Sequence, residues 1–140
     1  MKICSFLPSA TEILFALGLG DHVVGVSHEC HFPPEARHKR RLVRSLINPD
    51  RLSSEEIDRL VRATLNDRRS LYHVDREALQ ELAPDLIITQ ELCDVCALDA
   101  SSIQRAIAQL SNRPAVLSLH AHTMAEALNE ILRISQETGR

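Results

Sequence analysis

The fold can be read outward from residues 84–96, which have the sequence PDLIITQELCDVC. The first half is a short apolar run rich in β-branched residues, typical of a strand buried within a parallel sheet. The second half is a polar loop that contains two of the four cysteines. Ligands of open α/β sheets bind just beyond the carboxyl ends of the strands. The stretch therefore predicts a buried strand over 85–89 and, directly after it, part of a binding site.

Short apolar runs and helical patterns alternate along the rest of the chain. Further strands are expected at 3–7, 22–26, 42–43 and 115–119. Helices are expected to begin near Ser9, Ser53 or Ser54, Asp75, Asp99 or Ser101, and Thr123. The last helix is expected to turn Ala127, Leu128, Ile131 and Leu132 toward the core. This alternation predicts an α/β fold, a three-layer, Rossmann-like arrangement with a mostly parallel central sheet and helices on both faces.

Composition limits the functions that are open to the chain. Its 140 residues suit one domain, and its net charge of −3 argues against a general nucleic-acid surface. No apolar stretch is long enough to predict a membrane span. The first residues, MKICSFLP, lack the long apolar region and small-residue cleavage site of an export signal, so a cytoplasmic location is expected.

Polar side chains follow the predicted strands. Because parallel strands end at one edge of a sheet, the loops near Pro8, Ser27, Gln90 and His120 should gather there. Three of the four cysteines and several histidines fall in these loops. The clustering predicts a functional rim at the carboxyl ends of the strands.

The cysteines of this rim have two interpretations. Cys93 and Cys96 form a C-x-x-C pair, and Cys30 with His28 could complete a four-ligand zinc or iron site. This requires the 22–26 strand, the 3–7 strand and the 85–89 strand to lie side by side in that order. The alternative is that the cysteines are reduced and pack as small hydrophobic residues, as Cys4 is expected to do.

Sequence signatures of catalysis are missing. There is no G-x-S-x-G elbow and no phosphate-binding Walker loop, and Gly18 and Gly20 end a helix where a dinucleotide site needs glycines to begin one. The sequence therefore offers no motif to which catalysis can be assigned.

Three segments together resemble a known family. They are residues 5–20 (SFLPSATEILFALGLG), 23–36 (VVGVSHECHFPPEA) and 82–90 (LAPDLIITQ). In this order they resemble the substrate-binding proteins of iron-siderophore and cobalamin ABC importers, and the cobalamin-binding branch in particular. The resemblance implies one lobe of a two-lobe, helix-linked binding protein. Residues 1–122 correspond to the N-terminal α/β lobe and 123–140 to the start of the interlobe helix.

The resemblance and the predicted rim together suggest which residues bind. The turn beginning at Pro8 lies on the family's ligand rim, and 44–46 and 90–92 match loops that contact the corrin, although the family's aromatic residues are missing from both. Glu77 matches an acidic residue that docks onto the transporter. The expected ligand-binding residues are Pro8, Ser9, Thr11, Ser27, His28, Glu29, Arg44, Ser45, Leu46, Gln90, Glu91, Leu92 and His120.

The resemblance implies capture of cobalamin, another corrinoid or a related iron chelate without chemistry, so the chain is not expected to be an enzyme. An ABC permease is the expected partner if the protein is exported. The family resemblance implies a periplasmic or cell-surface location as the alternative to the cytoplasm. A cytosolic protein that handles metal or redox chemistry through its thiols, on the same fold, is the alternative function. A third possibility is an interaction domain that docks on a membrane partner through Glu77.

Overall fold

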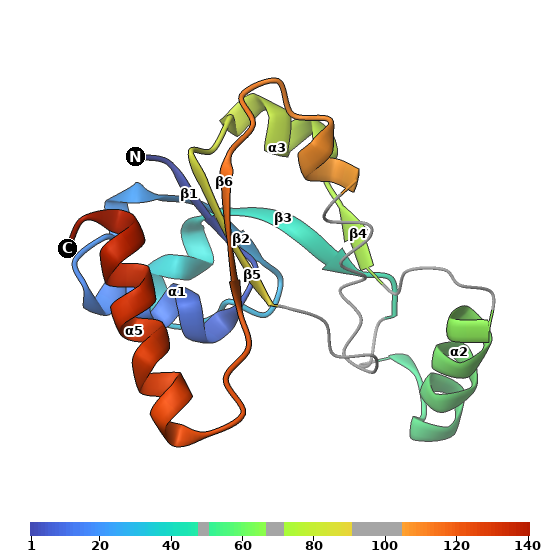
Figure 1. The fold of residues 1–140 in the computed structure, drawn as a ribbon. Helices are drawn as coiled ribbons and strands as arrows, with labels where there is room; N and C mark the ends of the chain where they lie inside the picture. Colours follow the sequence, from blue (N-terminus) through green and yellow to red (C-terminus); the bar gives the residue numbers. More distant parts are fainter. Residues whose placement is uncertain (48–50, 67–71, 91–104) are drawn as a thin grey trace.

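A computed structural model of the chain describes residues 1–47, 51–66, 72–90 and 105–140. Its centre is a six-stranded sheet in the order β4-β3-β2-β1-β5-β6 (Figure 1). Neighbouring strands run parallel, except that β4 pairs antiparallel with β3 at one edge. The strands are β1 (Ile3–Ser5), β2 (Val23–Ser27), β3 (Arg40–Ser45), β4 (Tyr72–Val74), β5 (Leu86–Gln90) and β6 (Ala115–Leu119).

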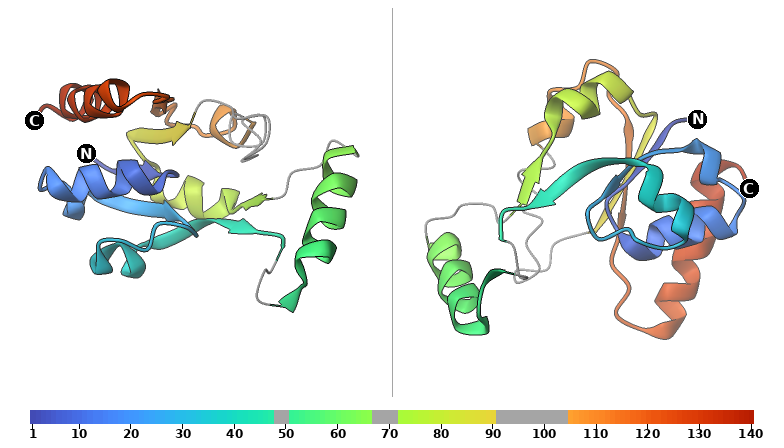
Figure 2. Two further views of the ribbon diagram at one scale, coloured as in Figure 1. Left: turned by 90° about the horizontal axis from the view of Figure 1, so that it is seen from below. Right: turned by 180° about the vertical axis from the view of Figure 1, so that it is seen from behind.

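Helices lie on both sides of this sheet, which gives the predicted three layers (Figures 1 and 2). The α-helices are α1 (Pro8–Ala16), α2 (Ser54–Asn66), α3 (Arg76–Leu82) and α5 (Met124–Thr138), and the 3-10 helices are η1 (Gly20–His22) and η2 (Pro34–His38). Residues 105–108 are also helical. Among the described residues, no helix is both long and apolar enough to cross a membrane.

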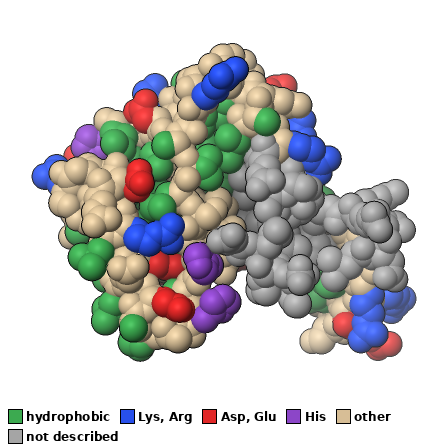
Figure 3. Space-filling model, in the orientation of Figure 1, with side chains coloured by type: hydrophobic (Ala, Val, Ile, Leu, Met, Phe, Trp, Pro, Cys, Tyr) green, Lys and Arg blue, Asp and Glu red, His purple; other side chains and the backbone are tan. Residues whose placement is uncertain are grey.

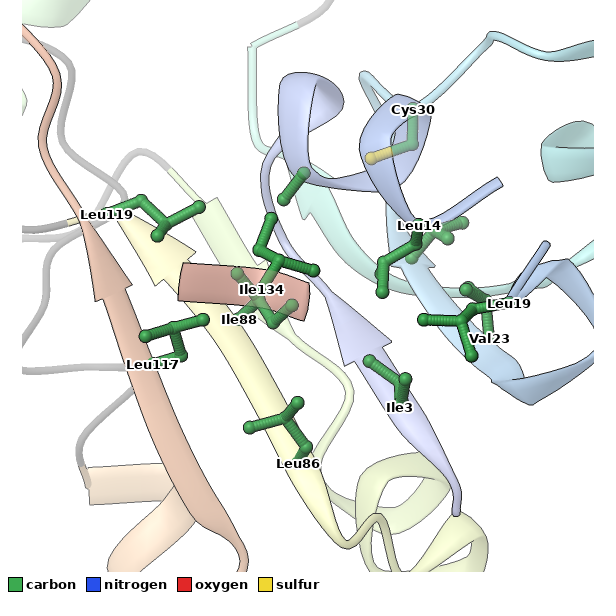
Figure 4. Close-up of a cluster of buried hydrophobic side chains, with 12 residues drawn as sticks. Ile3, Leu14, Leu19, Val23, Cys30, Leu86, Ile88, Leu117, Leu119 and Ile134 are labelled. Carbon is green, nitrogen blue, oxygen red and sulfur yellow. The ribbon is translucent and has the colours of Figure 1, made fainter. Parts of the chain in front are cut away.

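Alternating side chains of the strands point to opposite faces of the sheet and pack into two separate hydrophobic cores. On one face, Ile3, Ile88 and Leu117 pack against Leu14 of α1 and Ile134 of α5 (Figure 4). On the other face, the core is built around Cys4, Phe6 and Ile87, with Ala78 and Leu79 of α3. The two-residue period of β1 thus places Ile3 and Cys4 in opposite cores. The expectation that Cys4 is a core residue is confirmed, and burial raises the pKa of its thiol to about 12.

The strand order that the metal hypothesis requires is present, because β1 lies between β2 and β5. The strand predicted over 85–89 is β5, and its residues Leu86, Ile87 and Ile88 are buried as expected. It lies next to the edge strand β6, however, while β2 and β1 hold the middle of the sheet.

Two boundaries differ from the sequence prediction for local reasons. Helix α1 begins at Pro8 and its N-cap is Leu7, so Ser9 does not cap it. Proline suits the first helical position because its fixed φ is already helical and its missing N–H has no partner there. Strand β3 is longer than the predicted 42–43 and begins at Arg40, because pairing with β2 and β4 and burial of Leu42 and Val43 extend the strand.

The predicted inward face of α5 is wrong. Leu128 and Leu132 are about 60% exposed, while Glu130 and Ile134 are buried. The Glu130 carboxylate accepts a hydrogen bond of 2.9 Å from the backbone N–H of Ala121, so this acidic side chain is satisfied against the body of the protein. With Glu130 and Ile134 turned inward, hydrophobic side chains remain on the outside of α5 (Figure 3).

Candidate ligand-binding site

A small recess lies at the carboxyl ends of β1, β2 and β5, where the sequence predicts the rim. We call it the inner pocket; it has a volume of about 220 Å³. Its lining residues are Phe6, Leu7, Pro8, Ser27, His28, Glu29, Tyr72 and Gln90. Five of these were predicted to bind ligand, and they come together because three neighbouring parallel strands end there.

One wall of the inner pocket is the turn over residues 27–30, and Arg41 holds it in place. The Nη1 atom of Arg41 lies 2.6 Å from the carbonyl oxygen of Ser27, 3.0 Å from that of His28 and 3.2 Å from that of Cys30. Arg41 is on β3, the strand beside β2, so its guanidinium reaches the turn directly. The carbonyls at the end of β2 and in the turn after it thus receive charge-assisted hydrogen bonds.

His28 is the titratable group of this pocket. Its Nε2 atom lies 3.1 Å from Oε1 of the exposed Glu29, and its ring centroid lies 5.5 Å from that of Tyr72. Within the described part of the chain, its Nδ1 atom is buried without a hydrogen-bond partner. Burial lowers the pKa of His28, an effect that nearby Glu29 opposes and Arg41 reinforces. The imidazole is therefore neutral near pH 7.

Cys30 and Thr11, two residues expected at the rim, lie beneath it. Both are fully buried. The Thr11 hydroxyl lies 2.8 Å from Ser5 Oγ and 3.1 Å from Cys30 Sγ, and Ser27 Oγ lies 3.3 Å from the same sulfur. These contacts give the thiol a structural setting inside the core, as the packing interpretation of the cysteines expects.

The proposed metal site is only partly described. Among the residues with described positions, no group of three or more His, Cys, Asp or Glu side chains could hold a metal ion. Cys93 and Cys96, and likewise Glu91 and Leu92, lie outside the described residues. Cys30, the cysteine of this proposed site that the structure does describe, is fully buried.

A larger and more open hollow adjoins Tyr72. We call it the outer pocket; its volume is about 590 Å³, and it is lined by Arg44 and by residues 72–77. Arg44 and Glu77 are both exposed there. Ser45 and Leu46 are also exposed, and Leu46 leaves 65% of its side chain in solvent. Of the segment 44–46, which the family resemblance assigned to ligand contact, Arg44 lines the outer pocket.

Two other predicted rim residues lie elsewhere. Ser9 is exposed on the first turn of α1 and does not line either pocket. His120 is exposed after β6 and lines a separate hollow of about 280 Å³ with residues of α5, such as Glu126 and Arg133. Its ring centroid is 6.3 Å from that of His122, so both histidines face the same side.

Tyr72 and Arg41 are site residues that the sequence analysis missed. Tyr72 lies on β4, a three-residue strand that was not predicted, and it lines both pockets. Its aromatic, β-favouring run Tyr72–Val74 was the available signal. Arg41 lies just before the predicted strand 42–43, and nothing local in the sequence indicates that its guanidinium reaches the 27–30 turn.

No family model matches the chain. Curated relatives match part of the chain in sequence. An uncharacterized ABC transporter substrate-binding lipoprotein of Bacillus subtilis is 40% identical over 57 residues, which is 41% of this chain and 18% of that protein. A vitamin B12-binding protein of Vibrio cholerae is 36% identical over 61 residues, which is 43% of this chain and 22% of that protein. The matches thus span only about a fifth of these relatives.

Solved structures share the fold along nearly the whole chain. The periplasmic vitamin B12 binding protein of Vibrio cholerae has a TM-score of 0.65 and 24% identity, over 96% of this chain and 40% of that one. A periplasmic heme binding protein of Pseudomonas aeruginosa has a TM-score of 0.63 and 18% identity, over 99% of this chain and 38% of that one. At identities below 25%, these two similarities show a shared fold and nothing more.

These relatives correct one expectation. The cytoplasmic location inferred from the first residues is wrong, because the matching proteins are a lipoprotein and periplasmic proteins. The relatives agree with the alternative that the family resemblance gave. They are also binding proteins, not enzymes.

The resemblance found in the sequence is confirmed. This chain's homologues and structural neighbours are cobalamin, heme and iron binding proteins of the periplasmic, ABC-transporter type, and its coverage of about two fifths of the solved chains is consistent with their N-terminal lobe.

Proposed function

We propose that this chain is the N-terminal lobe of a substrate-binding protein of an ABC transporter and captures a corrinoid or a related iron chelate without chemistry. The observation that carries the proposal is the convergence of Pro8, Ser27, His28, Glu29 and Gln90 on one pocket at the carboxyl ends of three parallel strands. The relatives that match in sequence include a vitamin B12-binding protein, which favours a corrinoid over other chelates.

In this proposal, residues 1–122 form the binding lobe and 123–140 begin the interlobe helix. The inner and outer pockets share Tyr72 and together offer one surface to the ligand. Arg44, Ser45 and Leu46 contact the ligand from the exposed side, and Gln90 from the end of β5. Affinity comes from apolar contacts and a few polar groups that orient the ligand.

Glu77 has a separate proposed role as a docking residue for the permease. It is exposed in the first turn of α3, at the border of the outer pocket. An exposed carboxylate there can pair with arginines of a partner protein, which favours encounter more than it adds affinity.

Titration calorimetry with cyanocobalamin and with hemin tests the function. Saturable binding of cyanocobalamin to the 140-residue chain, weakened by Gln90→Ala and not by Arg59→Ala on the distant helix α2, is the expected result. A chain that binds neither compound at millimolar concentration contradicts the proposal.

A further inference from the structure

The inner pocket is too small for a whole macrocycle. Sites that enclose a drug-sized ligand have volumes of about 300–1,000 Å³. The inner pocket measures about 220 Å³, whereas the neighbouring outer pocket measures about 590 Å³. A corrin or porphyrin ring can therefore lie over the mouth of the inner pocket, but only a compact part of the ligand can enter it.

The lining of the inner pocket suits a flat aromatic group. Buried Phe6 lines it together with Leu7 and Pro8. The rings of His28 and Tyr72 also line it, with centroids 5.5 Å apart and planes inclined at 42°. Aromatic groups are attracted to such rings at centroid distances of about 4.5–7 Å.

The pocket is also formed in advance of binding. Arg41 fixes the backbone of the 27–30 turn through three carbonyl oxygens. Beneath the turn, the sulfur of Cys30 is held by the hydroxyls of Thr11 and Ser27. Because this wall is already ordered, ligand binding costs it little conformational entropy. Contacts with even a small group of the ligand can therefore increase the affinity of the protein for that ligand.

We propose that the inner pocket receives a compact planar aromatic group that projects from the macrocycle of the ligand, with His28 and Tyr72 as its contacts. In a cobalamin this group is the dimethylbenzimidazole of the nucleotide arm, whereas a heme carries no such projecting ring. The inner pocket then selects cobalamins over hemes and over corrinoids that lack the arm. This proposal rests on the proposed function of corrinoid capture.

Calorimetry with cyanocobalamin and cobinamide tests it, because cobinamide keeps the corrin ring but lacks the nucleotide arm. We expect cyanocobalamin to bind about tenfold more tightly than cobinamide. His28→Ala and Tyr72→Leu should each remove most of this difference by weakening cyanocobalamin alone. His22→Ala is the matched control, since His22 is similarly half-buried but precedes β2, at the opposite end of the strand from His28.

A second measurement needs no variant. Free 5,6-dimethylbenzimidazole, added at millimolar concentration to the wild-type chain, should shift the NMR signals of the His28 and Tyr72 rings and leave those of His22 in place. Equal binding of cyanocobalamin and cobinamide overturns the pocket proposal and leaves corrinoid capture standing. A shift caused by the free base, without corrinoid binding, supports the pocket and overturns corrinoid capture; no response to any of the three compounds overturns both.

Discussion

Protonation of His28 should lower the free energy of unfolding of the chain. Burial lowers the pKa of this imidazole in the folded state below its value of 6.5 in the unfolded chain. Below pH 6.5 the unfolded chain therefore binds more protons at this position, and the free energy of unfolding falls as the pH falls through the folded pKa. At pH 7.5 and above, His28 is neutral in both states and its contribution is fully present.

Urea unfolding of the wild type and of His28→Asn, measured from pH 7.5 down to pH 5, checks this prediction. Carboxylates titrate in both proteins, so the effect of His28 is the difference between the two curves. The wild type should lose more stability than the variant between pH 6.5 and 5. Parallel curves would show that the His28 environment does not discriminate between its two charge states.

Arg41 should matter to stability far more than its neighbour Arg44. Arg41→Met removes the donor shared by three carbonyl oxygens of the 27–30 turn, which should cost about 1.5–3 kcal/mol. Arg44→Met, on the same strand but exposed, should change stability by less than about 0.5 kcal/mol. Chemical denaturation gives both values, and hydrogen exchange should show faster exchange at Cys30 N–H in the first variant alone.

Single residues of the site were predictable where they follow directly from a strand end. Ser27, His28 and Gln90 converge because parallel strands release their chains at one edge. Tyr72 reaches the same pocket through an antiparallel edge strand, and Arg41 through a long side chain from a neighbouring strand. Neither route leaves a periodic signal in the sequence.

The exposed side of helix α5 carries Leu128 and Leu132, and substitutions there test the orientation of the helix. Leu128→Gln combined with Leu132→Gln should change the free energy of unfolding by less than about 0.5 kcal/mol per site, because both side chains are about 60% exposed. The same change should reduce self-association, since it removes exposed apolar surface. Denaturation and sedimentation velocity at several concentrations measure the two effects.

Ile134→Ala is the matched control on the same helix. Ile134 is fully buried against the first core, so its truncation should cost about 2–5 kcal/mol. If the double glutamine variant proved as destabilised as Ile134→Ala, the described orientation of α5 would be wrong.

Helix starts were easier to predict than helix faces. Ser53 with Glu56 and Thr123 with Glu126 form the hydrogen bonds of capping boxes, and backbone N–H groups at these starts lower the pKa of each glutamate. The face of α5 was mispredicted because hydrophobicity alone placed Leu128 inward, while the hydrogen bond from Ala121 to Glu130 fixes a different rotation.

Ligand binding should stabilise the molecule as a whole if the pockets belong to the folded state. At a free cyanocobalamin concentration of 100 times its dissociation constant, the gain should be about 2.7 kcal/mol. Thermal unfolding at increasing ligand concentration measures this as a rising midpoint. A midpoint that stays constant while calorimetry reports binding would place the ligand on unfolded or partly folded chains.

The architecture was predictable because strands and helices alternate clearly from residue 3 to residue 138. Burial of Leu86–Ile88 follows from their unbroken apolar run, whereas the position of β1 between β2 and β5 was a condition of the metal hypothesis that the structure meets. The edge of the sheet was less predictable, since β3 and β4 depend on pairing between residues far apart in sequence, such as Arg44 and His73.

The position of β1 also sets the order in which the chain can assemble. Ile3 pairs with Leu86, and the backbone N–H of Lys2 donates a 2.6 Å hydrogen bond to the Asp85 carboxylate, across 83 residues. A ribosome therefore releases the first strand long before its second neighbour exists. Pairing over such separations is slow because the loop entropy must be lost first. Until β5 emerges, one edge of β1 stays open, and the future middle of the sheet remains an unpaired edge.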